Sequence, residues 1–420
     1  MQGILNEDRR RQVLVLVAVA AALEEEEYRA AGEAARARER EVEEEERRRR
    51  DAPRRLWCRQ WIARRGQFGW YEQLMVELEA EDQKHFTSMM RMEPAMFHEL
   101  VERLTPAIEK QHTSCRAPLP PGLKVAITLK YLASGANYKT LMEGFHVADN
   151  TISLVVREVC RAIIQVLRPE LRCPTTEAEW LEVERGFAAK WNFHHALGAL
   201  DGKHIRIKKP PKSGSHYHNY KGFFSIVLLA LVDWNYKFLW VECGANGSCS
   251  DAQLFNASRM VTKLEEGELN LPDARPLPHD DKEMPYFFIG DDAFALKWWL
   301  MKPYSRRNMT RQQAIYYYRC SRARRVVENA FGILANRFQC LLGTMQQMPD
   351  AVQDIVLACV YLHNLMRTRY PRLQNELVDG EDERHALVPG QWREDVQQLP
   401  DIEHITHPGR ENERAKNQRV

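Results

Sequence analysis

The sequence lacks a cysteine framework, a long apolar run and a large net charge, and each absence excludes a class of protein. Its nine cysteines include no Cys-x-x-Cys pair, which argues against a secreted disulfide scaffold and favours a reducing compartment. The longest apolar run, residues 13–23, has 11 residues, well short of the roughly 20 that cross a bilayer, so we expect no membrane partner. The formal charge of +2 over 420 residues gives no argument for a nucleic-acid partner, which must instead be sought in local charge.

Both ends of the chain differ in composition from its middle. Taken whole, 44% apolar and 28% charged residues predict a globular protein with a sizeable core. Residues 1–55 contain a long run of Glu, Arg and Ala, which predicts a charged extension that is helical or disordered. Residues 371–420 lack apolar periodicity, so we expect an extended or disordered tail, draped on the preceding domain through Trp392 and Leu399.

The pattern of residues 56–167 predicts an all-α module. Two helices are expected over 122–134 and 138–143, and a third is indicated by an apolar stripe of Ile152, Val155, Val156, Val159 and Ile163. The sequence GFHVADNTIS before the third helix is typical of the turn of a helix-turn-helix, with Asp149 or Asn150 capping a recognition helix. A small helical bundle without DNA contact fits the same pattern.

Residues 180–370 change to strand-like patterns followed by helices. Short apolar runs predict strands at 193–201, 223–233, 238–244 and 286–289. The dipeptide Trp234-Asn235 indicates that the second and third runs form a hairpin. Helices are expected at roughly 312–340 and 350–369. This order predicts a mixed α/β fold in which helices cover both faces of the sheet.

Three acidic residues stand beside these runs in positions that favour a shared site. Asp201 ends the first run and Asp291 follows the last one after a single glycine, and ligand sites on open α/β sheets gather where strands end. Glu328 flanks the buried stripe of the first of these helices, so it can reach a sheet edge. Each of the three alone can be a helix or turn cap. Together they supply the carboxylate oxygens that divalent cations such as Mg²⁺ require.

Two basic segments flank these acids along the chain. Residues 203–221 hold six Lys or Arg, residues 302–325 hold eight, and neither segment contains an acid. This is the electrostatic footprint of phosphate-backbone binding. The aromatic run Tyr316, Tyr317 and Tyr318 in the second segment either stacks on unpaired bases or belongs to the core.

Six motifs in this order resemble those of the PIF/Harbinger group of DDE transposases. They are GALDGKHI, HYHNYKGFFSIVLLALVD, NGSCSDAQLF, YFFIGDDAFAL, RARRVVENAFGILANRF and ACVYLHNLM. The resemblance covers roughly residues 55–370. It implies an RNase H-like mixed sheet covered by helices over 180–370, preceded by the all-α helix-turn-helix-like module.

The resemblance also implies roles for individual acids. Asp201, Asp291 and Glu328 match the catalytic acids of the family's DDE set, which bind a divalent metal cation, Mg²⁺ or Mn²⁺. Asp251 matches a further Asp of the family and is expected to support the metal site. Because Ser250 and Asp251 precede an apolar run, a helix cap is the alternative for Asp251.

Basic residues near these acids are expected to neutralise phosphate, namely Lys203, His204, Arg324 and Arg325. The chain departs from the family pattern at two places. Ser250 stands where the family usually has His, and Asp292 follows Asp291 directly. Strand alternation allows only one of these two Asp side chains to face the metal. Neither departure removes a carboxylate.

The combined prediction is a divalent-metal-dependent endonuclease that hydrolyses DNA phosphodiester bonds. The alternative is a domesticated DNA-binding or scaffold protein in which catalysis is idle. A third idea is a zinc site using His216, His218, Cys243 and Cys249, although their spacing fits no standard pattern. The resemblance implies a Myb-like DNA-binding partner, and basic clusters such as Lys208, Lys209 and Lys212 predict a nuclear location, with the cytoplasm as a second one. Assembly with further copies of the chain is also expected.

Overall fold

The computed structural model describes most of the chain between residues 58 and 370. The described residues are 32–33, 36–44, 58–111, 117–305, 307–370, 378–381, 387–390 and 392–393. They belong to two compact units, Met1–Gln60 and Trp61–Val420. In the first unit, residues 36–44 are helical. No helix in the described part of the chain is long and apolar enough to span a membrane.

The second unit begins with helices. They are α2 (Gln60–Ala63, which starts at the boundary), α3 (Arg65–Phe68), α4 (Leu74–Glu81), α5 (Gln83–Met90), α6 (Pro94–Ile108), α7 (Pro121–Ser134), α8 (Tyr138–Phe145), α9 (Asp149–Val166), η1 (Arg168–Glu170) and α10 (Glu177–Trp191). The helices predicted over 122–134 and 138–143 are confirmed by α7 and α8, and the whole predicted stripe of α9 is buried.

The predicted cap of α9 is wrong. Ala148 occupies the cap position without a side-chain hydrogen bond, and Asp149 is the first helical residue. Its Oδ1 accepts the N–H of the next residue, Asn150 (2.9 Å), and His146 in the preceding turn adopts a left-handed conformation (φ 50°). At the first helical position, the negative charge of Asp149 still interacts favourably with the positive end of the helix dipole.

The sheet and its covering helices follow. The strands are β1 (Ala196–Arg206), β2 (Ser225–Val232), β3 (Phe238–Asn246), β4 (Arg275–Pro276), β5 (Glu283–Met284), β6 (Phe287–Ile289), β7 (Leu300–Met301), β8 (Gly380–Glu381) and β9 (Leu387–Val388). The helices are α11 (Asp251–Asn256), α12 (Arg259–Glu265), α13 (Arg311–Arg337), η2 (Gln339–Leu341) and α14 (Pro349–Arg369). The helices predicted near 312–340 and 350–369 are confirmed by α13 and α14.

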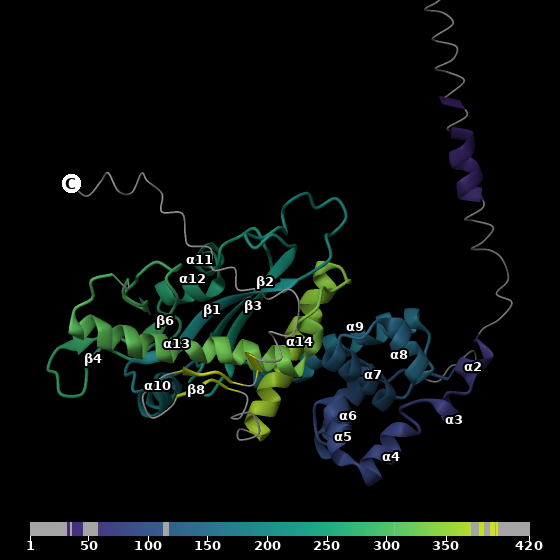
Figure 1. Ribbon diagram of the computed structural model, residues 1–420, viewed down its shortest axis with the longest axis horizontal. Helices are drawn as coiled ribbons and strands as arrows, with labels where there is room; N and C mark the ends of the chain where they lie inside the picture. Colours follow the sequence, from purple (N-terminus) through teal and green to yellow (C-terminus); the bar gives the residue numbers. More distant parts are fainter. Residues whose placement is uncertain are drawn as a thin grey trace, which may run out of the picture. The chain divides into compact units, whose positions relative to one another are not determined.

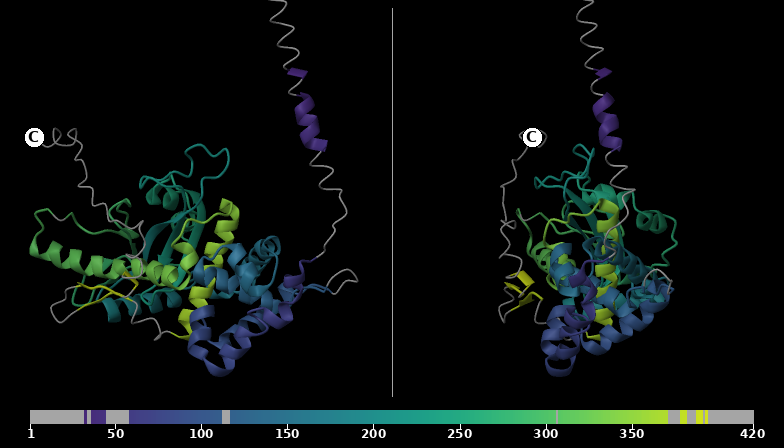
Figure 2. Two further views of the ribbon diagram at one scale, coloured as in Figure 1. Left: turned by 45° about the vertical axis from the view of Figure 1, so that its right-hand side comes forward. Right: turned by 90° about the vertical axis from the view of Figure 1, so that its right-hand side faces the viewer.

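The main sheet has five strands in the order β3-β2-β1-β6-β7. Strands β1, β2 and β3 pair antiparallel, with β2 and β3 forming the predicted hairpin, whereas β6 runs parallel to β1 and to β7. Every residue of β2 is buried, which requires cover on both faces. Figures 1 and 2 show α13 crossing the strands on one face. The predicted fold, an all-α region followed by a mixed RNase H-like sheet with helices, is confirmed.

Strand alternation divides the apolar side chains of β2 between two cores. Ile226, Leu228 and Ala230 belong to a core that includes α13 and α14, while Leu229 and Leu231 belong to a second core with α11 and α12. This is the period of two expected of a strand that is buried on both sides. The polar side chains of β1 alternate in the same way, so neighbouring polar residues of this strand lie on opposite faces of the sheet.

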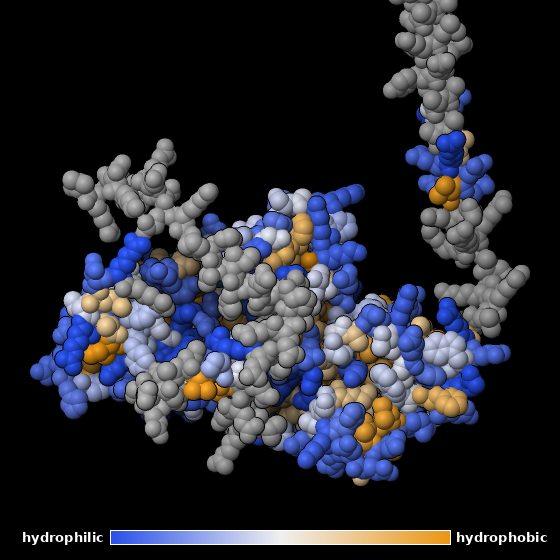
Figure 3. Space-filling model, viewed as in Figure 1, coloured by the Kyte–Doolittle hydropathy of each residue, from blue (hydrophilic) through white to orange (hydrophobic). Residues whose placement is uncertain are grey.

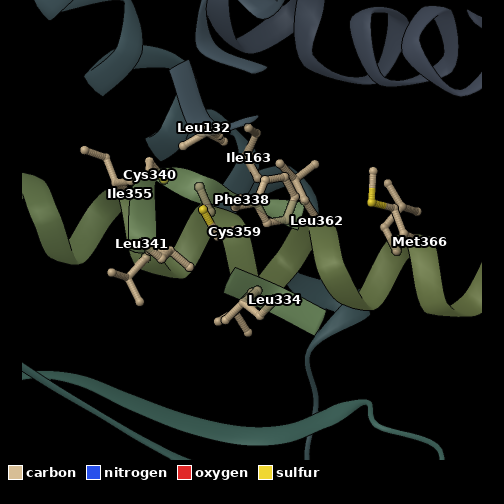
Figure 4. Packing of buried hydrophobic residues seen from close by; sticks show 14 of the residues in the cluster. Leu132, Ile163, Leu334, Phe338, Cys340, Leu341, Ile355, Cys359, Leu362 and Met366 are labelled. Carbon is tan, nitrogen blue, oxygen red and sulfur yellow. The ribbon is translucent and has the colours of Figure 1, made fainter. Parts of the chain in front are cut away.

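The helical module shares the first of these cores with the sheet. Leu132 of α7 and Ile163 of α9 lie against the side of α14 that carries Cys359 and Leu362, with Phe338 between them (Figure 4). All five side chains are buried. The region that reads in the sequence as two modules therefore has one continuous apolar interior.

The visible surface is mainly hydrophilic, with apolar side chains gathered in a few small patches (Figure 3). The described parts of the C-terminal tail include one contact predicted from the sequence. Trp392 Nε1 donates a hydrogen bond to Asn329 Oδ1 of α13 (3.0 Å), and its ring fills the space above Gly332. Leu399, the other predicted contact, lies outside the described residues.

Candidate functional site

Asp201 and Asp291 lie at matching levels on neighbouring strands. Ala199 of β1 pairs with Ile289 of β6, and the two acids follow two residues further along each strand. Asp291 comes after β6 as predicted, but the prediction that Asp201 ends its strand is wrong. β1 continues to Arg206 because its antiparallel pairing with β2 is unbroken from Ala199 onward. Asp201 therefore lies in the middle of a strand, where the backbone holds it firmly.

The electrostatics of Asp201 are dominated by burial. Burial raises the pKa of Asp201 to about 7; Arg324 and the Gly202 N–H oppose this rise, and the carboxylates of Asp291 and Glu328 add to it. The Gly202 N–H donates to Asp201 Oδ1 (2.9 Å). An acid with so raised a pKa gains from a nearby cation, because the cation compensates the charge that burial disfavours.

Helix α13 brings Glu328 and Arg324 to the same face, one turn apart. Arg324 Nη2 donates to Glu328 Oε1 (2.6 Å). Burial opposes the charge of Arg324, but the carboxylates of Glu328, Asp201 and Asp291 together raise its pKa. The guanidinium thus lies among three acids that come from β1, from the end of β6 and from α13.

Asp251 approaches the same region from the other face of the sheet. It is the first residue of α11, and Ser250 provides the cap through a capping box with Gln253. The alternative prediction that Asp251 caps the helix is therefore wrong. Its carboxylate lies against Gly202, where an added Cβ would be 2.2 Å from Oδ1. This Oδ1 is buried without a hydrogen-bond partner.

The neighbouring Asp292 points away from this group. Its side chain is 82% exposed, and its Oδ1 lies 3.6 Å from Lys302 Nζ. Asp291, in contrast, influences the pKa of both Asp201 and Asp251. Of the two adjacent acids, Asp291 is the one that faces the site.

The predicted phosphate-binding residues separate into three places. Lys203 is on the Asp201 face of β1, with Nζ 5.9 Å from the centroid of the Phe331 ring, and burial lowers its pKa. His204 is on the opposite face with Asp251, and its Nδ1 lies 3.0 Å from Ser225 Oγ. Arg324 joins the acids, but Arg325 lines a separate cavity of about 280 Å³ beside α13.

Two other predicted groupings do not form. Within the described residues, no three His, Cys, Asp or Glu side chains are arranged to hold a metal ion. The zinc site of His216, His218, Cys243 and Cys249 is therefore not assembled; Cys243 lies in the apolar core. Tyr316 packs against Phe193 at a centroid distance of 5.9 Å, so the core alternative holds for this tyrosine.

Two residues of the site were not singled out from the sequence. Lys221 lowers the pKa of Asp251, against the rise caused by burial, and its place in the acid-free segment 203–221 was the available signal. Arg393 of the tail has Nη2 3.8 Å from Glu328 Oε2 and 2.6 Å from Asp379 Oδ2. No pattern in the tail indicates that contact.

The donor set fits a hard divalent cation. Asp201, Asp251, Asp291 and Glu328 offer only carboxylate oxygens, which such ions prefer. The buried Asp251 Oδ1 lacks a partner, and such an atom is costly unless something binds it. Arg324 supplies positive charge among the other three acids, and within the described residues no three of these carboxylates are arranged closely enough to hold an ion.

Comparison with known proteins finds a family model that matches the part of the chain containing this site. Residues 200–364 match the model of a family described as DDE superfamily endonuclease. The matched segment contains all four carboxylates, beginning one residue before Asp201. No solved structure matches the chain.

Several curated proteins are similar over a longer stretch. HARBI1 of Homo sapiens, whose name describes it as a candidate nuclease, is 26% identical over 287 residues, which cover 67% of this chain and 77% of that protein. Protein ALP1-like of Arabidopsis thaliana is 26% identical over 253 residues, 59% of this chain and 61% of its own. Antagonist of Like Heterochromatin Protein 1, also from Arabidopsis thaliana, is 24% identical over 246 residues, 58% of this chain and 61% of its own.

Proposed function

We propose, from the match of residues 200–364 to the family described as DDE superfamily endonuclease, that the chain is a divalent-metal-dependent endonuclease that hydrolyses DNA phosphodiester bonds. The observation that carries the proposal is the convergence of Asp201, Asp291 and Glu328 around Arg324. These acids come from two strands and a helix, yet they influence one guanidinium. A structural role would not require three half-buried acids from separate elements to lie beside one another.

Each residue has a role that follows from its position. Asp201 and Asp291 would hold the ion from adjacent strands, with Asp251 in support from the opposite face. A bound Mg²⁺ or Mn²⁺ would polarise the phosphodiester and lower the pKa of the attacking water. Glu328 would orient this water and accept its proton at a carboxylate oxygen. The guanidinium of Arg324 would then bind the phosphate through two parallel hydrogen bonds.

The test uses the purified chain and a panel of labelled DNA duplexes with Mn²⁺ or Mg²⁺. Asp201→Asn and Glu328→Gln are expected to reduce nicking about 100-fold or more, since even outer partners of metal ligands cost 10- to 100-fold. Asp292→Asn is the matched control, because this neighbouring acid is 82% exposed and faces away. Nicking that survives both site substitutions would come from a contaminant and would refute the proposal.

A second function is favoured by one observation. Glu328 is engaged by Arg324 and lies near Arg393, so these two guanidinium groups already neutralise its charge. If this arrangement persists with metal present, the chain would be a DNA-binding or scaffold protein with idle catalysis. Duplex binding without nicking, equal in the original chain and in Asp201→Asn, would select this alternative.

Partners and location are further parts of the proposal. We expect DNA as the ligand, a Myb-like DNA-binding protein as a partner, assembly with further copies of the chain and a nuclear location. The exposed basic residues Lys208, Lys209 and Lys212 support binding to phosphate or nuclear import. The name of one Arabidopsis relative refers to heterochromatin, which agrees with the nucleus. Imaging of the tagged full chain in cells tests the location.

A further inference from the structure

The loop between β1 and β2 presents an aromatic ring and a cation on the Asp251 face of the sheet. Tyr220 is 84% exposed, and Lys221 is exposed as well. The Tyr220 ring meets the His204 ring edge-on at a centroid distance of 5.7 Å, and Lys221 Nζ lies 5.5 Å from the centroid of the Tyr220 ring. Figure 1 shows this loop, in teal, extending beyond the sheet next to β2.

The charge of Lys221 acts on the site itself. Burial raises the pKa of Asp251, and Lys221 opposes this rise. Burial lowers the pKa of His204 to about 4, and Lys221 adds to this fall. The ammonium group is thus near both side chains on the Asp251 face of β1. Tyr220 and Lys221 therefore border Asp251 and do not form a remote surface.

Hydrogen bonds hold the loop in this shape. Buried Asn219 accepts the N–H groups of Lys221 (3.0 Å) and Phe223 (3.2 Å) at Oδ1, and donates from Nδ2 to Ser225 Oγ (3.0 Å). Gly222 between them adopts φ +87°, which favours glycine. An exposed aromatic ring on a fixed loop loses little conformational freedom when it binds a ligand.

The base of the loop is built from cations stacked on aromatic rings. The Arg206 guanidinium lies 4.3 Å from the centroid of Phe223, and Lys209 Nζ lies 5.5 Å from that of Phe224. Since residues 203–221 contain no acid, the loop presents only positive charge to an approaching polyanion. Alternating aromatic rings and cations are the composition of surfaces that bind single-stranded nucleic acid.

We propose that Tyr220 and Lys221 form a clamp for an unpaired DNA strand, in which Tyr220 stacks on a base and Lys221 contacts the adjoining phosphate. The clamp rests on the proposed nuclease function and names its substrate class: DNA that is single-stranded or locally unpaired next to the bond to be cut. The clamp would hold the strand on the Asp251 face of β1, with the bond to be cut following toward Asp201, Asp291 and Glu328. Tyr220 and Lys221 are positioning residues in this scheme, because neither reaches the acids that act on the phosphodiester.

The test is photocrosslinking of the full chain to a short oligothymidylate with one central 5-iododeoxyuridine. The crosslink is expected in the tryptic peptide of residues 213–221, and it should disappear with Tyr220→Ala but persist with Tyr220→Phe. The affinity for the oligonucleotide should fall about 5- to 100-fold with Tyr220→Ala, as for other stacked bases. Lys221→Gln should reduce the slope of log affinity against log salt by about 0.7, the value for one contact to a single strand.

Two control variants separate the clamp from general effects. Phe68→Ala removes another exposed aromatic ring (59% exposed), and Lys263→Gln removes an exposed lysine that pairs with Glu268. Both should leave crosslinking and affinity unchanged. Equal affinity of the original chain and Tyr220→Ala for the oligonucleotide, or a crosslink outside residues 213–221, would overturn the clamp.

The same variants distinguish the clamp from the nuclease. Because crosslinking needs no cleavage, a crosslink at Tyr220 in a chain that never nicks DNA would keep the clamp and reject the nuclease. Metal-dependent nicking that is equal on paired and unpaired substrates, and equal in Tyr220→Ala, would keep the nuclease and reject the clamp.

Discussion

At the scale of single residues, the absence of a side chain at position 202 shapes the candidate site. The Asp251 carboxylate occupies the space where a Cβ of residue 202 would lie, with Oδ1 only 2.2 Å from that position. Gly202→Ala is expected to displace Asp251 and to lower nicking at least about 10-fold, while overpacking costs about 1–3 kcal/mol of stability. Nicking rates and urea unfolding of the variant measure both effects.

Gly343→Ala is the matched control, because no atom lies within 4 Å of its added Cβ. It should change neither nicking nor the free energy of unfolding by more than about 0.5 kcal/mol. Full activity in Gly202→Ala would mean that Asp251 does not contribute to the metal site.

The sequence allowed the acids to be identified but not their arrangement. Asp201, Asp291 and Glu328 stand beside apolar runs, and this signal is local. Their convergence on Arg324 depends on strand register and on the rotation of α13, which no local pattern specifies. The ion pair between Glu328 and Arg393 joins segments that are far apart in the sequence, so no local pattern could predict it.

At the scale of elements, helix α14 is tied to the β2–β3 hairpin by a buried histidine. His363 Nε2 lies 2.8 Å from the Tyr236 carbonyl oxygen, and burial lowers the pKa of His363 from 6.5 to about 3. Below pH 6.5 the unfolded chain binds a proton that the folded chain does not, so stability present at neutral pH is lost as pH falls. The loss should be about 2 kcal/mol at pH 5, since one pKa unit is worth about 1.4 kcal/mol.

Urea unfolding at pH 7.5 and pH 5 measures this loss. In His363→Gln the difference between the two pH values should shrink by that amount, whatever the cost of the substitution itself. His98→Gln is the control, because His98 is exposed and pairs with Glu79 on the surface. An undiminished pH dependence in His363→Gln would assign the acid sensitivity to other groups.

Elements with strong periodicity were predictable, and elements defined by pairing were not. The stripes of α7, α9 and α14 are encoded locally as apolar residues at helical spacing. The second half of β1 reads Gly-Lys-His-Ile-Arg and has no apolar alternation, so its strand character comes only from pairing with β2. For the same reason the short strands β4 and β5 gave no signal.

At the scale of the whole second unit, the helical module and the RNase H-like layer share an interior. Leu362 is fully buried where α14 meets the helices before the sheet. Leu362→Ala should cost about 2–5 kcal/mol, and both parts should still unfold together. Tryptophan fluorescence and far-ultraviolet circular dichroism against urea should therefore give one midpoint.

The control is Leu154→Ala on α9, since Leu154 is 69% exposed and its loss should change stability by less than about 0.5 kcal/mol. Two separate transitions in the original chain would show that the shared interior does not couple the two parts.

Among the buried free thiols of this shared interior, three lie on elements where the two parts of the second unit meet, namely α9 (Cys160), η2 (Cys340) and α14 (Cys359). A thiol-reactive dye can reach them only when the helical module separates from the sheet layer or the whole unit unfolds. When reclosing is fast, the labelling rate is the intrinsic thiol reactivity multiplied by the equilibrium constant for opening. The labelling rate of these cysteines therefore measures how often the helical module and the sheet layer separate. DNA bound to both parts would slow the labelling, and a ligand that separates them would accelerate it.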